Sequence, residues 1–280
     1  MPVVVVTDSA AAVPADLASE LDIMVVPLHV LVDDRAIAEG VDECEIDYGN
    51  SAVTTSSASP GELRAAYERA LTLSGGAGVV AVHISRQLSA TWEAGRQAVR
   101  DMDAADRVRL VDSLSAGLGT GLPVLAAARR AHAGASLDIV YDTAVATAGR
   151  ARTFIVVNRT EQLRRGGRLS SAALFFGTEL VTKPILQIVD GRLELREKAR
   201  TRSKAHAKLV AAAVDAAGED GAAVAVQHLG AASAAAAITE QLGELVPRIS
   251  ELITAEFGPT LGVHLGTGAV GVLVVPGGCG

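Results

Sequence analysis

The sequence predicts an α/β protein of two domains, the first with a mainly parallel sheet and the second with a mixed sheet. Short β-branched runs alternate with helical or turn-rich segments through the first half. The second half carries two strand-like runs joined by Asp190-Gly191, a dipeptide typical of the type I′ hairpin turn. A chain of 280 residues can form one large domain or two ordinary ones. We favour two, 1–150 and 151–280.

Four strand-like runs organise the first half: VVVVTD, IMVVPLHVLV, GVVAVHI and RVRLVD. Between the second and third, SPGELRAAYERAL predicts a helix, because Ser59 and Glu62 form a capping box and Pro60 takes the first helical position. The third and fourth runs each lead through a Ser- or Gly-rich turn into a helical segment. Ligands of open parallel sheets bind where strands lead into helices.

The second half begins with a strand in GRARTFIVV. LRRGGRLSSAALFFGTEL then predicts two helical stretches separated by Gly166-Gly167. KPILQIVDGRLELREKARTR predicts the hairpin that makes this sheet partly antiparallel. Two helices follow in SKAHAKLVAAAVDAAG and SAAAAITEQLGELV, with the strand AAVAVQHL between them.

Composition excludes several classes of protein. A net charge of −7 opposes a general nucleic-acid-binding surface. The sequence shows no signal peptide and no apolar run long enough to span a bilayer, which predicts a cytoplasmic protein. Cys44 and Cys279 form no disulfide framework or zinc motif, and the histidines lack metal-ligand spacing. We therefore expect neither a metal nor a cofactor.

A glycine motif near the end of the chain resembles a dinucleotide-binding loop. GTGAVG, residues 266–271, fits G-x-G-x-x-G, but that fingerprint requires a strand before the glycines and a helix after them. Here the glycines lead into the strand-like VLVVP instead. We therefore reject the dinucleotide interpretation, which leaves His264 among glycines that allow a ligand to approach the backbone.

Hydroxyl, acidic and basic side chains gather where the chain is expected to reverse. They are Thr54, Thr55, Ser56, Ser57 and Ser59; Ser85 and Ser89; Asp8-Ser9 and Asp112-Ser113; and Arg164, Arg165, Arg168, Arg200, Arg202 and Lys204. Serines before helices serve equally as N-caps, the acids as Asx turns, and the basic set as a solvated face. Together they favour an anionic small ligand bound between two α/β domains. They do not name it.

The order of the motifs resembles the DegV family. TDSAAAVP, TTSSASPGEL, ISRQLSATW, VDSLSAGLGTG, LRRGGRLS, KPIL with DG, EKARTR and GVHLGTGAVG follow one another along nearly the whole chain. The resemblance implies a carrier that binds a long-chain fatty acid and presents its carboxylate to a separate ATP-dependent subunit of a fatty acid kinase. The acyl phosphate would pass towards phospholipid synthesis, with transient contact with the membrane or an acyltransferase, and the carrier itself would be no enzyme.

The resemblance also implies site residues. Thr55, Ser89 and His264 match the family's carboxylate ligands, and a secondary shell falls on Ser56, Ala90 and Gly266. Arg168 matches the residue that meets the phosphate or the kinase, with Arg200 and Arg202 as further candidates. Ser57-Ala58 replaces the family's Gln-Pro, and Thr267 replaces a proline in the glycine motif, so the loop shapes and the preferred acyl chain can differ.

An enzyme remains the alternative. His264 would be the general acid/base and Arg168 the anion clamp for a small carboxylated or phosphorylated metabolite. The absence of a Walker A motif agrees with a carrier that depends on a separate kinase.

Overall fold

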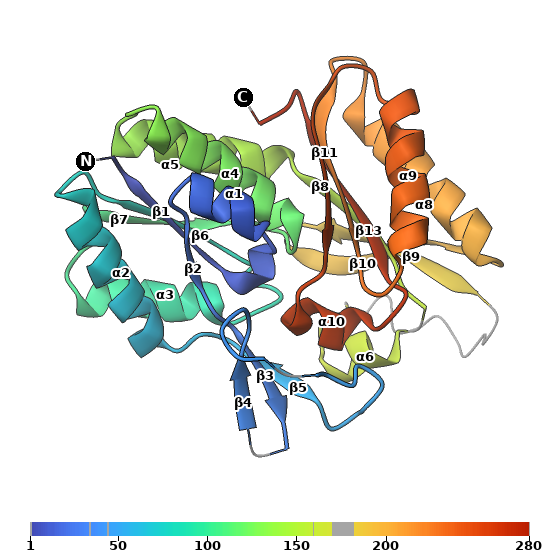
Figure 1. The fold of residues 1–280 in the computed structure, drawn as a ribbon, viewed down its shortest axis with the longest axis horizontal. Coiled ribbons are helices and arrows are strands. Elements are labelled where there is room, and N and C mark those ends of the chain that lie inside the picture. Colours follow the sequence, from blue (N-terminus) through green and yellow to red (C-terminus); the bar gives the residue numbers. More distant parts are fainter. Residues whose placement is uncertain (1, 34, 44, 159, 170–181, 280) are drawn as a thin grey trace.

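The fold is built on three sheets (Figure 1). The computed structural model describes residues 2–33, 35–43, 45–158, 160–169 and 182–279. The first sheet is entirely parallel in the order β2-β1-β6-β7, with β1 at Val4–Asp8, β2 at Met24–Val26, β6 at Val79–His83 and β7 at Val108–Asp112. The two central strands, β1 and β6, are almost fully buried because helices cover both faces of the sheet.

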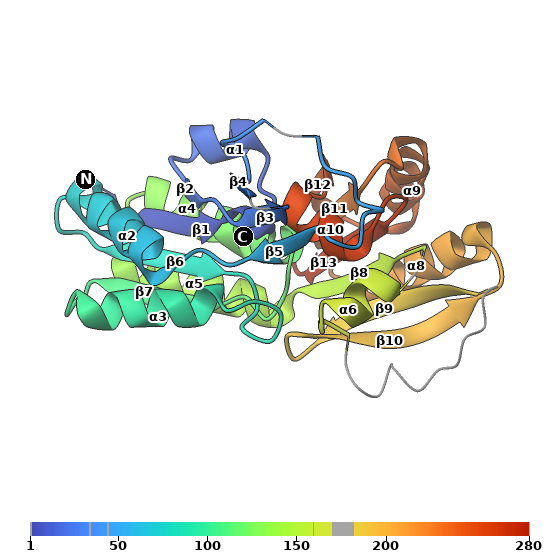
Figure 2. The same ribbon diagram turned by 90° about the horizontal axis from the view of Figure 1, so that it is seen from below.

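The helices of the first half lie on opposite faces of the parallel sheet (Figures 1 and 2). On one face are α2 at Pro60–Ser74 and α3 at Thr91–Asp101; on the other are α4 at Leu118–His132 and α5 at Leu137–Arg150. The predicted capping box of α2 is confirmed, since Glu62 N donates to Ser59 Oγ and Ser59 N to Glu62 Oε2. Helix α5 was not predicted.

A small antiparallel sheet projects from the first half. Its order is β4-β3-β5, with β3 at His29–Val32, β4 at Arg35–Ala38 and β5 at Thr54–Ser56. The run IMVVPLHVLV therefore divides at Pro27, with β2 before it in the parallel sheet and β3 after it in the small one. Proline lacks the N–H that a continuous ladder needs. Between β1 and β2 lie a short 3-10 turn, Ser9–Ala11, and α1 at Ala15–Glu20.

The second half forms a six-stranded mixed sheet in the order β10-β9-β8-β13-β11-β12. Its strands are β8 at Arg152–Val156, β9 at Lys183–Val189, β10 at Arg192–Ala199, β11 at Ala222–His228, β12 at Ile249–Glu256 and β13 at Val270–Pro276. The hairpin is confirmed: Asp190 and Gly191 have φ of 47° and 79°, as a type I′ turn requires. Strand β12 was not predicted.

Within the described part of the second half, four helices accompany this sheet. They are α6 at Glu161–Arg165, α8 at Arg202–Ala217, α9 at Ala232–Leu245 and α10 at Pro259–Leu265. The helical stretch predicted after Gly167 falls mainly on 170–181, outside the described residues. No helix within the described ranges is long and apolar enough to cross a membrane.

The fold class is confirmed as α/β, with a parallel first sheet and a mixed last one. The strands change sheets between Asp112 and Arg152. Helix α4 packs against both sheets, with Leu118 and Leu125 sharing a buried cluster with Leu273 and Val275 of β13. The two-domain division at residue 150 stays a prediction.

Candidate functional site

A cavity of about 300 Å³ lies where the small sheet, α10, α6 and the β9–β10 hairpin meet. Its lining is mainly apolar, with polar side chains from several separate parts of the sequence. The apolar residues include Leu28, Ile84, Leu88, Ile155, Leu163, Ile188, Leu193, Phe257, Leu261, Leu265 and Leu273; the polar ones include Thr55, Ser56, Ser57, Ser89, Arg168 and His264. An apolar space with a few polar groups suits a small amphipathic ligand.

Thr55 and His264 meet in the wall of this cavity. Thr55 Oγ1 of β5 and His264 Nε2 of α10 are 2.8 Å apart, although the residues are 209 positions apart in the sequence. Burial, together with the charge of Arg168, lowers the pKa of His264 from 6.5 to about 4. The imidazole is therefore neutral at pH 7, so one ring nitrogen donates a hydrogen bond and the other accepts.

Ser89 lines the same cavity from the loop before α3. Its Oγ accepts from Thr91 N at 3.3 Å and lies 2.9 Å from Thr91 Oγ1. Ser85, the other N-cap candidate, donates instead to the Gly191 carbonyl at 2.9 Å, which fixes this loop to the tip of the hairpin. Only Ser89 of these two faces the cavity among the described residues.

Arg168 connects two loops of the site. Its Nε donates to the Leu88 carbonyl at 3.1 Å, and its Nη1 donates to the Gly166 carbonyl. Leu88 immediately precedes Ser89, so the guanidinium holds the loop that presents this serine. Gly166 also lies against the imidazole: a Cβ there would stand 2.9 Å from His264 Nδ1. These roles of Leu88 and Gly166 have no signature in a single sequence.

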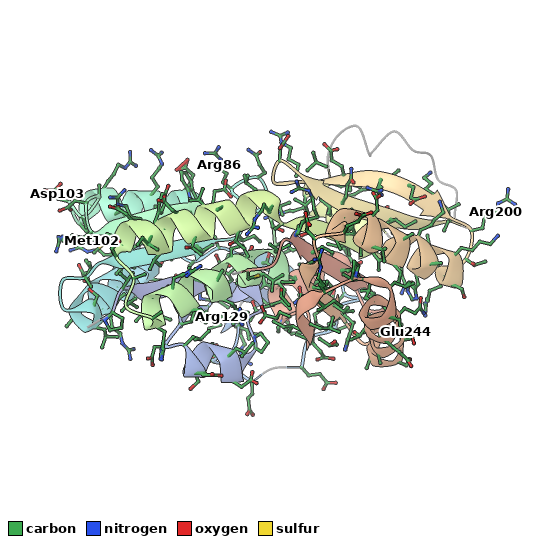
Figure 3. The ribbon with its side chains drawn as sticks, turned by 90° about the horizontal axis from the view of Figure 1, so that it is seen from above. Arg86, Met102, Asp103, Arg129, Arg200 and Glu244 are labelled. Atoms are coloured by element: carbon green, nitrogen blue, oxygen red, sulfur yellow. The ribbon has the colours of Figure 1, made fainter. Side chains whose placement is uncertain are left out.

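The remaining predicted site residues divide into two groups. Ser56 and Ala90 line the cavity. Gly266 does not; it borders a neighbouring pocket, where a Cβ would stand 2.7 Å from Gln162 Oε1. Arg202 donates to Asn158 Oδ1 at 3.2 Å, and Arg200 projects from the end of the molecule (Figure 3). Among the described residues, neither of these two arginines lines the cavity.

The acids at the strand ends have structural partners. Asp8 is fully buried, accepts from Ile84 N at 3.0 Å and lies 2.9 Å from His83 Nδ1. Asp112 accepts from Leu114 N at 3.0 Å, which is the Asx-turn alternative. The glycines of GTGAVG follow helix α10 and open strand β13, the reverse of the order that a dinucleotide loop needs.

Helix α10 is held through closely packed glycines, a role that we did not identify from the sequence, where the glycines around His264 were expected to leave room for a ligand. A Cβ on Gly258 would stand 1.9 Å from Glu39 Oε1, and one on Gly262 would stand 2.6 Å from Tyr48 Cε1. Gly258, Gly262 and Gly266 are spaced four residues apart, which places them along one side of α10, with Gly258 and Gly266 at its two ends. Thr260, Leu261 and His264 meanwhile line the cavity. The glycine periodicity was the signal available in the sequence.

Related proteins share this chain's fold and sequence. The model of a family described as "Uncharacterised protein, DegV family" matches residues 2–277. A DegV domain-containing protein of Mycobacterium tuberculosis is 43% identical over 274 residues, which cover 98% of this chain and 97% of that protein. The crystal structure of a DegV family protein from Corynebacterium glutamicum is 39% identical, with a TM-score of 0.88 and coverage of 99% and 98% of the two chains.

Two similar structures are of proteins that bind fatty acids. A DegV family protein from Thermus thermophilus has a TM-score of 0.89 at 30% identity, covering 99% of this chain and 100% of that one. DegV from Bacillus subtilis has a TM-score of 0.84 at 30% identity, covering 98% and 99%. With a family match along almost its entire length, the chain belongs to the DegV family.

Proposed function

We propose that this chain binds a long-chain fatty acid, with its alkyl chain in the apolar cavity and its carboxylate at Thr55, Ser89 and His264. The observation that carries the proposal is the contact between Thr55 and a neutral His264 in the wall of an otherwise apolar cavity. The fatty-acid-binding relatives from Thermus thermophilus and Bacillus subtilis support it. Ser56 and Ala90, which line the cavity, would complete the surroundings of the head group.

The energetics fit such a ligand. Each methylene removed from water contributes about 0.8 kcal/mol, so a long chain supplies most of the affinity. A carboxylate withdrawn from water needs hydrogen-bond donors. Hydroxyl and imidazole groups can donate to it, and the guanidinium that lines the cavity, that of Arg168, already donates to the carbonyls of Leu88 and Gly166.

We further propose that the bound fatty acid is presented to a separate ATP-dependent kinase subunit. A carboxylate oxygen would attack the γ-phosphorus of ATP; the new O–P bond forms as the bond to the ADP oxygen breaks, and ADP leaves. The chain would act as a cytoplasmic carrier that delivers the acyl phosphate towards phospholipid synthesis, with transient contact with a membrane or acyltransferase. Arg168, Arg200 and Arg202 would serve phosphoryl transfer or kinase docking.

The enzyme alternative requires His264 to exchange protons near neutral pH. A general acid/base works best when its pKa lies near the working pH. Because burial and the charge of Arg168 lower the pKa of His264 to about 4, its imidazole is poorly suited to donate a proton at pH 7.

Mass spectrometry of the purified protein after denaturation and extraction tests the proposal. We expect fatty acid at close to one molecule per chain. Protein that is free of lipid, does not take up added fatty acid, and turns over a water-soluble metabolite would support the enzyme alternative instead.

A further inference from the structure

A second pocket, of about 180 Å³, lies directly outside the head-group end of the cavity. It shares Thr55, Arg168 and His264 with the cavity, so these side chains separate the two spaces. Its outer part is formed by Asn50, Ser51, Thr54, Gln162 and Arg165. Helices α6 and α10, which carry part of this wall, lie side by side in both views (Figures 1 and 2).

The chemistry of this head-group pocket is that of an anion site. Among the described residues, its lining includes two guanidinium groups, hydroxyls, amides and an imidazole, but no carboxylate. This is notable in a chain of net charge −7. The positive field reaches the shared wall, because the charge of Arg168 contributes to lowering the pKa of His264. Val53 and Val263 also line the pocket. The donors of the other side chains offer an anion hydrogen bonds that a methylene chain cannot accept.

The two arginines of the head-group pocket differ in their engagement. Arg168 already donates to the carbonyls of Leu88 and Gly166. Arg165, at the end of α6, is exposed and makes no hydrogen bond or ion pair with any residue that the structure describes. Of the two guanidinium groups, that of Arg165 therefore keeps all its N–H donors available to a ligand.

We propose that the head-group pocket holds the phosphoryl group of an acyl phosphate, with Arg165 as its main cation. The inference rests on the proposed function. With the acyl carbonyl at Thr55 and His264, a phosphoryl group on the adjacent oxygen would pass beside these shared side chains into the head-group pocket. Arg165 then meets phosphate oxygens, which suit its planar fork. The subsite keeps the product on the carrier after transfer.

Binding of matched ligands to the full chain, stripped of lipid, tests this subsite. The probes are hexadecanoic acid and a β-ketophosphonate of the same acyl chain, which keeps the carbonyl and replaces the bridging oxygen of an acyl phosphate by a methylene. Arg165→Gln should weaken ketophosphonate binding by at least about tenfold and leave hexadecanoic acid binding nearly unchanged. Arg164→Gln is the matched control, because both arginines border the neighbouring pocket but Arg164 does not line the head-group pocket, and it should change neither affinity.

Three results would contradict the proposed phosphoryl subsite without contradicting fatty acid binding. They are a wild-type protein that binds the acid but not the ketophosphonate, an Arg165 variant with unchanged ketophosphonate affinity, and equal ketophosphonate losses in the two arginine variants. If Arg165→Gln weakens the binding of hexadecanoic acid and of the ketophosphonate equally, Arg165 does not recognise the phosphoryl group specifically. That result also contradicts the proposal. If the wild-type protein binds neither hexadecanoic acid nor the ketophosphonate, the proposed function itself is wrong.

Discussion

At the scale of single residues, the site depends on how burial changes the chemistry of a few polar groups. His264 is neutral because the cavity wall excludes water and Arg168 lies near it. Thr55 gives this imidazole a partner at 2.8 Å, so a ligand carboxylate would meet a pair that is already ordered. Ordering the donors before binding reduces the entropy that binding would otherwise cost.

Replacing the hydroxyl donors should weaken fatty acid binding. Thr55→Ala and Ser89→Ala each remove a hydrogen bond to a charged group, worth about 1.5–3 kcal/mol. Fatty acid affinity, measured by titration of stripped protein, should fall accordingly, and a double-mutant cycle should show coupling if both hydroxyls contact one carboxylate. Thr54→Ala is the control, since Thr54 lines the head-group pocket and not the cavity that holds the acyl chain. Unchanged affinity in both variants would remove Thr55 and Ser89 from the head-group site.

The lowered pKa of His264 predicts a loss of stability in acid. Because this pKa falls from 6.5 to about 4 on folding, the unfolded chain takes up the proton first as the pH drops. The contribution of His264 to the free energy of unfolding is therefore complete above pH 6.5 and is lost progressively towards pH 4, by about 3 kcal/mol in all. Denaturant unfolding of stripped wild type and His264→Gln at pH 7 and pH 5 checks this. Equal losses in the two proteins would contradict it.

At the scale of elements, the site is assembled from segments distant in sequence: β5, the loop before α3, the loop after α6, and α10. Helix α10 is short and has little intrinsic stability, so its position depends on packing. Glu39 and Tyr48 lie against Gly258 and Gly262, where a Cβ would collide with them. The placement of His264 thus depends on glycines beside the residues that line the cavity.

Gly262→Ala should displace α10 and weaken fatty acid binding along with stability. Its Cβ would stand 2.6 Å from Tyr48 Cε1, and overpacking of this kind costs about 1–3 kcal/mol. Gly149→Ala in α5 is the control, because nothing lies within 4 Å of its Cβ position. That control should be neutral or stabilising by up to about 1 kcal/mol. Thermal unfolding and ligand titration measure both effects, and a Gly262 variant that behaves like the control would refute this packing argument.

The elements predicted from sequence are those with strong local signals. The capping box of α2 and the Asp190-Gly191 turn fix their own conformations, and both are confirmed. Strand β12 was missed although its burial alternates along its length, because an edge strand carries many polar residues. The contacts of Arg168 with Leu88 and Gly166 depend on tertiary approach, which local periodicity does not encode.

At the scale of the whole molecule, the cavity exists because the three sheets and the loops between them converge on one place. The small sheet brings Thr55, the parallel sheet brings Ser89 through the loop after β6, and the mixed sheet supplies Ile188 and Leu193 from its hairpin. Ser85 Oγ joins the loop of the parallel sheet to the tip of this hairpin. The apolar lining thus spans both halves of the chain.

The affinity of the stripped chain for hexadecanoic acid and for its methyl ester tests the central claim most directly. The two ligands share the acyl chain, so the cavity should bind both, but only the acid presents a carboxylate to Thr55, Ser89 and His264. We expect the acid to bind at least about tenfold more tightly than the ester, and Thr55→Ala to reduce that ratio. Equal affinity for the acid and the ester in the wild-type protein, or binding of neither, would contradict the account.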